Sequence, residues 1–252
     1  MPEIIQAESM ALILNIETST EVCSVSLAKN GNLLFKKESI EGMNHSRKLS
    51  VFIEEIFAEN NMQINALDAI AVSKGPGSYT GLRIGVSVAK GLCYGLNIPL
   101  ISVNSLEILG VFAAQNLTEY NLPNDGIPVL FCPLIDARRM EVYTSLYNVK
   151  GEELRPVSAE IIDGQFLSDL LENNKILFFG NGAEKCKTTI KNKNAFFQGP
   201  VITSAQFMQS ISERKFNNWI PEAAALIRPY HSLSIELSGK MTLGDFNNAG
   251  FL

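Results

Sequence analysis

The spacing of apolar residues changes several times along the first hundred positions, and each spacing predicts one kind of element. Residues 11–16 form a continuous apolar run that is typical of a buried strand, and residues 22–27 alternate with a period of two. Asn30-Gly31 follows, a pair that favours a tight hairpin because both turn positions tolerate positive φ. A third strand is expected over residues 33–39. The chain is therefore predicted to open with three consecutive strands.

The spacing then becomes helical. Residues 46–59 are predicted to form a helix, and residues 69–72 a short buried strand. The glycine-rich segment 75–81 is expected to turn the chain into a second helix over residues 79–96. The first helix is indicated by apolar residues at i, i+3, i+4, i+7 and i+8, namely Leu49, Phe52, Ile53, Ile56 and Phe57.

The second predicted helix is rich in glycine. Each glycine in a helix interior costs roughly 1 kcal/mol relative to alanine, so we expect something to approach this helix backbone closely. After it, residues 98–103 are predicted as a strand and residues 105–116 as a helix capped by Ser105. The glycines in question are Gly81, Gly85, Gly91 and Gly95.

The second half of the chain repeats this order of elements, which predicts an α/β fold of two related lobes, each a mixed sheet with flanking helices. We place the first lobe at residues 10–118 and the second at 119–230, with extensions at 1–9 and 231–252. The repeat is indicated by expected strands at 129–135, 141–147, 152–157 and 176–179 and by expected helices at 165–172 and after Gly182.

Composition narrows the class of protein. Of the 252 residues 46% are apolar and 19% charged, a balance that excludes a disordered chain. The net charge of −5 implies that bulk electrostatics would not hold a nucleic acid, so a nucleic-acid role would need a local patch or a basic partner. The four cysteines form no C-x-x-C pair, and no basic residue precedes Lys29. We expect a cytoplasmic protein without a membrane segment.

Two turns at the starts of helices or hairpins are candidate anion sites. Gly75, Gly77, Ser78 and Thr80 would present backbone N–H groups at a helix start, with Arg83 one turn later, which suits a phosphate or carboxylate. The spacing does not match a Walker A loop, and a simple tight turn remains the alternative. At the first hairpin Glu17 would be the carboxylate nearest a metal-bound phosphate, or its neighbours would merely satisfy turn backbone.

No convincing catalytic set emerges from the sequence. His45 and His231 are the only histidines and neither has a neighbour at metal-ligand spacing. Asp136, Arg138 and Arg139 would suit either an anion or a salt bridge within a hairpin. The single basic cluster is expected to be a solvated helix face, with RNA contact as the alternative; it comprises Lys185, Lys187, Lys191 and Lys193.

Several of these segments together resemble the TsaB (YeaZ) family of bacterial proteins, which serve the synthesis of threonylcarbamoyladenosine in tRNA. The glycine-rich segment is the most specific of them, and the resemblance covers roughly residues 10–158 well. Glu17 departs from the pattern, because family members more often carry Asp there. The matching segments are residues 12–25, 44–46, 67–72, 75–86, 99–106 and 135–143.

The resemblance implies a fold of the actin, sugar-kinase and Hsp70 type and a non-catalytic role. TsaB relatives lack the metal-binding histidine pair of TsaD, the transferase that modifies the adenosine beside the anticodon, and so does this chain. They pair with TsaD, form a homodimer when alone, and work with the ATPase TsaE. No intrinsic cofactor is implied, since ATP and metal would reside on the partners, and most tRNA contacts would be theirs as well.

The partner interface of the family lies on two first-lobe helices, which map here to residues 46–59 and 79–96. A small-molecule kinase or an endopeptidase of the same fold is the alternative, and a self-associating domain without a role in tRNA chemistry is a third. A kinase would need an acidic phosphate loop in each lobe and a metallopeptidase paired histidines. The interface candidates are His45, Leu49, Phe52, Gly81, Arg83, Gly85 and Val88.

Overall fold

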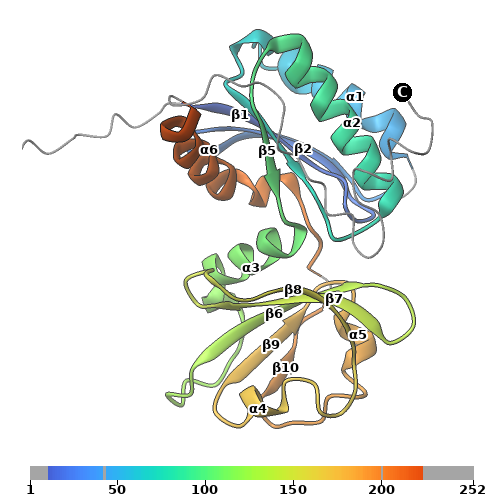
Figure 1. The fold of residues 1–252 in the computed structure, drawn as a ribbon, viewed down its shortest axis with the longest axis vertical. Coiled ribbons are helices and arrows are strands. Elements are labelled where there is room, and N and C mark those ends of the chain that lie inside the picture. Colours follow the sequence, from blue (N-terminus) through green and yellow to red (C-terminus); the bar gives the residue numbers. More distant parts are fainter. Residues whose placement is uncertain (1–10, 42–43, 200, 224–252) are drawn as a thin grey trace, which may run out of the picture. The chain divides into compact units, whose positions relative to one another are not determined.

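The structure, a computed structural model, describes residues 11–41, 44–199 and 201–223, which form two compact lobes (Figure 1). Within this described part, the first lobe contains residues 11–73, 80–103 and 204–223, and the second contains 74–79 and 104–203. The expected extensions at 1–9 and 231–252, together with residues 224–230, lie outside the described residues.

The first lobe is built on a five-stranded mixed sheet with the order β3-β2-β1-β4-β5. The first three strands are antiparallel neighbours, whereas β1, β4 and β5 are parallel. All six residues of β1 are buried, as expected for a central strand whose two faces are both covered. The strands are β1 (Leu12–Glu17), β2 (Cys23–Lys29), β3 (Asn32–Ser39), β4 (Ala69–Ser73) and β5 (Leu100–Val103).

Helices cover both faces of this sheet. In Figure 1, α1 and α2 lie on one side of the strands and α6 lies on the other. The helix α1 packs on β2 and β3, and α6 packs on β1, β3 and β5. The helical elements of this lobe are α1 (His45–Ala58), η1 (Ile64–Ala66), α2 (Tyr79–Leu96), η3 (Ala205–Phe207) and α6 (Gln209–Ala223).

The second lobe repeats this plan, with the sheet order β8-β7-β6-β9-β10. Its antiparallel part is again formed by the first three strands, and β9 and β10 run parallel to β6. Its elements are α3 (Ser105–Gln115), η2 (Leu117–Glu119), β6 (Val129–Asp136), β7 (Glu141–Asn148), β8 (Glu153–Ile161), α4 (Ser168–Leu171), β9 (Lys175–Phe179), α5 (Ala183–Cys186) and β10 (Ala195–Phe197).

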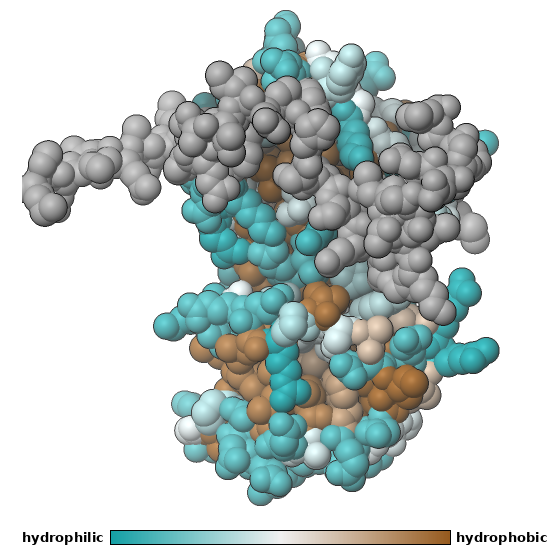
Figure 2. Space-filling model, in the orientation of Figure 1, coloured by the Kyte–Doolittle hydropathy of each residue, from teal (hydrophilic) through white to brown (hydrophobic). Residues whose placement is uncertain are grey.

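Successive side chains of a strand point to opposite faces of the sheet, so the core of the second lobe is divided into two layers. Phe131 and Ile135 of β6 pack with Leu106 and Leu109 of α3, whereas Leu134 faces the layer under α4 and α5. On the surface, Figure 2 shows apolar side chains gathered over the β9–β10 side of this lobe and framed by polar ones. The half-buried residues of β10 fit this picture of a sheet edge that is only partly covered.

The predicted fold of two related α/β lobes, each a mixed sheet with flanking helices, is confirmed by the matching strand orders. Two segments group differently from the boundaries drawn on the sequence. The helix α3 belongs to the core of the second lobe, and residues 204–223 return to the first. The return is fixed by hydrogen bonds between remote residues: Ser26 Oγ donates to Ala205 O at 2.8 Å, and Ala205 N donates to Ser24 Oγ at 2.9 Å.

No helix within the described ranges combines the length and the apolar character needed to cross a membrane.

Candidate partner interface

Helix α1 is held on the sheet by one apolar face. Leu49, Ile53 and Ile56 are buried at the spacing of successive helical turns. Val51 on the outward side of the helix is 47% exposed. The predicted stripe therefore anchors the helix, and two of its members, Ile53 and Phe57, also border the groove described below.

Helix α2 is anchored in the same way. Leu82, Val86, Ala89 and Cys93 are buried on one face at intervals of three or four residues. The adjoining positions Val88 and Leu92 are only half-buried. They lie one turn apart on the side that faces the groove described next.

An open, mainly apolar groove of about 510 Å³ lies between α1, η1 and α2. Its walls are formed by residues of both helices and of the segment that follows α1. Grooves of this kind, with apolar walls and a few polar residues at the edge, are typical of surfaces that receive another protein. The lining residues are Ser50, Ile53, Glu54, Phe57, Ala58, Met62, Gln63, Ile64, Val88 and Leu92.

Only one of the seven interface candidates, Val88, lines this groove. Leu49 is fully buried, and His45 is buried with Nε2 3.2 Å from the carbonyl oxygen of Val22. Phe52 is half-buried but is not part of the groove, and Arg83 is exposed. The structure thus places Leu49 and His45 inside the lobe, where they support the helix and do not offer surface to a partner.

The glycines of α2 serve different purposes. A Cβ on Gly85 would collide with the hydroxyl of Thr18, so this glycine lets the helix approach the β1–β2 turn of its own lobe. Gly85, one of the interface candidates, thus packs within its own lobe and does not offer surface to a partner, and Gly81 is buried as well. Gly91 and Gly95, by contrast, are exposed, and a Cβ on either would meet nothing within 4 Å.

The glycine-rich turn before α2 has the backbone that its sequence predicts. Gly75 has a φ of 101° and Gly77 a φ of 155°, conformations that side chains disfavour. Gly75 O accepts a hydrogen bond from Ser105 N at 2.9 Å, while Ser78 and Thr80 are exposed. Anion binding by this turn stays a prediction.

The carboxyl group of Glu17 is enclosed by its own turn. Glu17 is fully buried, and its Oε1 accepts a hydrogen bond from Ser19 N at 2.5 Å. Burial raises the pKa of Glu17 above its ordinary value, against the lowering effect of the hydrogen bonds from Ser19, Ser73 and Thr18. A side chain in this position is poorly suited to reach a metal-bound phosphate in solution.

The cysteines are also enclosed. All four are free and buried, and burial raises the pKa of Cys23 to about 11 and that of Cys93 to about 12. Thiols with such values are almost entirely protonated near neutral pH and are weak nucleophiles. Across the described part of the chain, no three His, Cys, Asp or Glu residues are grouped so that they could hold a metal ion.

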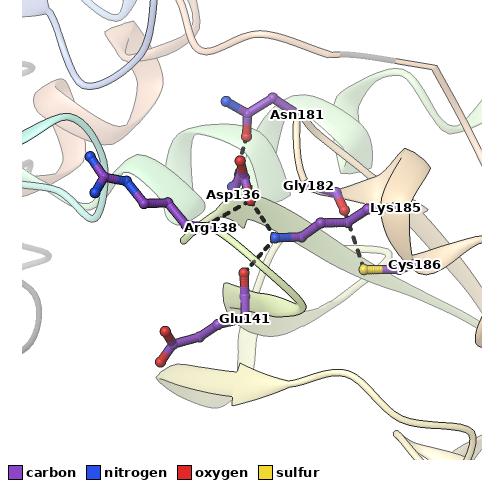
Figure 3. Close-up of polar contacts among 7 residues, drawn as sticks. All are labelled: Asp136, Arg138, Glu141, Asn181, Gly182, Lys185 and Cys186. Atoms are coloured by element: carbon purple, nitrogen blue, oxygen red, sulfur yellow. Dashed lines mark hydrogen bonds and ion pairs between the residues drawn. The ribbon is translucent and has the colours of Figure 1, made fainter.

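In the second lobe the hairpin between β6 and β7 carries a polar cluster (Figure 3). Lys185 Nζ forms an ion pair with Asp136 and donates to Glu141 O at 2.6 Å. Asp136 N donates to Asn181 Oδ1 at 3.0 Å, and Asp136 Oδ1 accepts from Arg138 N at 3.1 Å. The salt bridge expected within the hairpin is therefore not formed among the described residues, because Asp136 pairs with Lys185 of α5 and with neither guanidinium group. Lys185 is correspondingly not a purely solvated side chain.

Comparison with known proteins assigns the family. The chain is 34% identical over 215 residues to the tRNA threonylcarbamoyladenosine biosynthesis protein TsaB of Bacillus subtilis, which covers 84% of this chain and 89% of that protein. The chain belongs to the TsaB family. The resemblance of the sequence motifs to TsaB is thereby confirmed. Among solved structures, YeaZ from Pseudomonas aeruginosa has a TM-score of 0.68 and 25% identity, covering 88% of this chain and all of that one.

The chain is also similar to the transferase itself. Residues 39–227 match the family model of TsaD, described as tRNA N6-adenosine threonylcarbamoyltransferase. The transferase of Geotalea daltonii is 35% identical over 112 residues, which cover 38% of this chain and 33% of that protein. The similarity to this transferase thus spans about a third of the enzyme, whereas the similarity to the Bacillus TsaB spans most of both chains.

Proposed function

We propose that this TsaB-family chain is a non-catalytic subunit that a TsaD-like transferase requires in order to place the threonylcarbamoyl group on the adenosine beside the anticodon of tRNA. The α1–α2 groove is the observation that carries the proposal. Its lining residues Val88 and Leu92 are half-buried apolar side chains that a partner helix would cover. The same groove would serve a homodimer when the chain is alone.

The enclosure of Glu17 supports the non-catalytic part of the proposal. A kinase of this fold would present a carboxylate at the first turn to metal-bound phosphate, and here burial disfavours the charged form of that group. We assign ATP and metal to the partners, a TsaD-like transferase and a TsaE-like ATPase. With a net charge of −5, this chain would leave most tRNA contacts to them, in the cytoplasm.

Reconstituted transfer of threonylcarbamoyl to tRNA tests the proposal. Transferase and ATPase from the same organism are titrated with the parent chain, with Gly91→Leu and with Leu92→Glu. Gly91 is exposed, a Cβ there would meet nothing within 4 Å, and it directly precedes the groove residue Leu92, so the first variant should hinder a partner at the groove while the lobe stays folded. We expect both variants to need at least about tenfold more protein for half-maximal rate, corresponding to about 1.4 kcal/mol of binding.

Leu154→Glu is the matched control, because Leu154 is a half-exposed apolar residue of β8 outside the groove. It should titrate like the parent chain. Full transfer activity without any of this protein would overturn the proposal. A lower maximal rate that no excess of Gly91→Leu restores would instead indicate a direct chemical contribution.

A further inference from the structure

The tip of the β6–β7 hairpin presents two arginines on unfavourable backbone. Arg138 has a φ of 74° and Arg139 a φ of 48°, and both side chains are exposed. Residues with a Cβ seldom adopt positive φ, and glycine or asparagine is the usual occupant of such positions. Two adjacent exposed arginines there have no evident packing role, which points to a role for their charge.

Nearby contacts leave that charge available. Lys185 pairs with Asp136, the acid two residues before Arg138, and Figure 3 shows the Arg138 side chain directed away from this pair. The Glu141 carboxylate also projects away from Lys185, which bonds the Glu141 backbone instead. Within the described residues, neither Arg138 nor Arg139 forms an ion pair.

The corresponding turn of the first lobe is built in the opposite way. The β1–β2 turn occupies the same place in the repeated strand order, yet Glu17, Thr18 and Ser19 are buried there. Since the repeat does not require a basic exposed tip, the arginines are a particular property of the second lobe.

The surroundings favour an extended polyanion. The helix α5 packs on β6 next to the hairpin, and the chain after it carries the exposed residues Lys187, Lys191 and Lys193. Residues 136–141 and 181–193 together hold six basic side chains and three acidic ones, in a chain that is acidic overall. An exposed site gains little from a single small phosphate, because water and salt screen it, whereas a polymer contacts several cations at once.

We propose that Arg138 and Arg139 bind backbone phosphates of RNA and so give this chain a direct contact with the nucleic acid. That the RNA is tRNA rests on the proposed function above; the phosphate contact itself does not. Each guanidinium would donate two hydrogen bonds to a phosphate, which positions the RNA without reading its sequence.

The test is the salt dependence of binding of an unmodified tRNA transcript to the full chain, followed by fluorescence anisotropy from 25 to 200 mM KCl. Arg138→Asn/Arg139→Asn removes both charges and places a residue that tolerates positive φ at each site. We expect the slope of log K against log salt to become shallower by about 1.4 to 1.8, the value for two lost phosphate contacts. The melting temperature should stay the same or rise, whereas loss of a structural role would lower it.

Lys29→Asn/Lys150→Asn is the matched control, since both lysines are exposed and lie outside this cluster. Its slope should equal that of the parent chain. The inference would be overturned if the arginine variant and the parent chain had the same slope of log K against log salt. It would also be overturned if the parent chain showed no measurable RNA binding at 25 mM KCl. Binding of inorganic pyrophosphate that the arginine variant loses, together with unchanged RNA binding, would replace RNA by a small phosphate ligand.

The transfer assay separates this inference from the proposed function. If the parent chain is required for transfer but the arginine variant has the same salt-dependence slope as the parent, the subunit role stands and the RNA contact fails. If the slope changes but transfer proceeds without the chain, the RNA contact stands and the subunit role fails.

Discussion

Gly85 of α2 lies directly against the side chain of Thr18, so the helix backbone approaches the β1–β2 turn as closely as a residue without a Cβ allows. Thr18 is fully buried. The glycine is therefore part of the internal packing of the first lobe, and substituting it would disturb the lobe itself.

A pair of glycine substitutions tests this relationship. Gly85→Ala should lower the free energy of unfolding by about 1–3 kcal/mol, because the added methyl group overpacks against Thr18. Gly91→Ala in the same helix should raise it by about 0.5–1 kcal/mol, since alanine favours helix and the site is open. Urea unfolding of both variants measures the two effects. Equal changes of the same sign would contradict the assignment of Gly85 to internal packing.

The N-terminal cap of α3 allows a second pair of substitutions to be compared. Asn104 Oδ1 accepts a hydrogen bond from Leu106 N at 2.8 Å, so Asn104 and not the predicted Ser105 caps the helix. Asn104→Ala should therefore lower the free energy of unfolding by about 1 kcal/mol. Ser105→Ala should change it by less than about 0.5 kcal/mol, because Ser105 Oγ is buried without a hydrogen-bond partner among the described residues. A larger loss for Ser105→Ala would refute this assignment.

Glu17 predicts a specific dependence of stability on pH. Its pKa is raised by burial in the folded chain, so the folded state holds the proton more tightly than the unfolded state, where the value is near 4.5. This contribution to stability is complete below that pH and declines as pH rises through the folded-state pKa, by at most about 1.4 kcal/mol per pH unit.

Glu17→Gln removes this titration. We expect the free energy of unfolding of the parent to fall relative to that of the variant between pH 5 and 8, as measured by urea titration at each pH. A constant difference across this range would show that Glu17 does not change its protonation on unfolding.

Local patterns account for most of the elements that the sequence predicts. The bounds of α2 agree with the expected residues 79–96, and the strands of the first lobe agree within one or two residues, because their periodicity is set by the faces they bury. The edge strand β10 was not predicted. Its three residues are all half-buried and give no alternation.

What the sequence does not reveal depends on remote contacts. The groove includes Met62 and Ile64 from the segment after α1, which carry no helical periodicity. The purpose of Gly85 depends on Thr18, 67 positions earlier, and the return of η3 to the first lobe depends on Ser24 and Ser26. The sequence could have predicted Leu92 as an interface residue, because it lies one helical turn after the candidate Val88.

Self-association of the isolated chain follows from the same groove. An unpartnered apolar surface of this kind favours a second copy when no transferase is present, and a specific dimer would cover on the order of 800 Å² on each chain. We expect light scattering and sedimentation to show a dimer at micromolar concentrations. Val88→Glu should raise the dissociation constant at least about tenfold, because it would bury a charge in the groove. Leu154→Glu adds the same charge on β8 and should leave the dimer intact. A parent chain that remains monomeric at high concentration, or equal effects of the two variants, would remove the groove as the site of self-association.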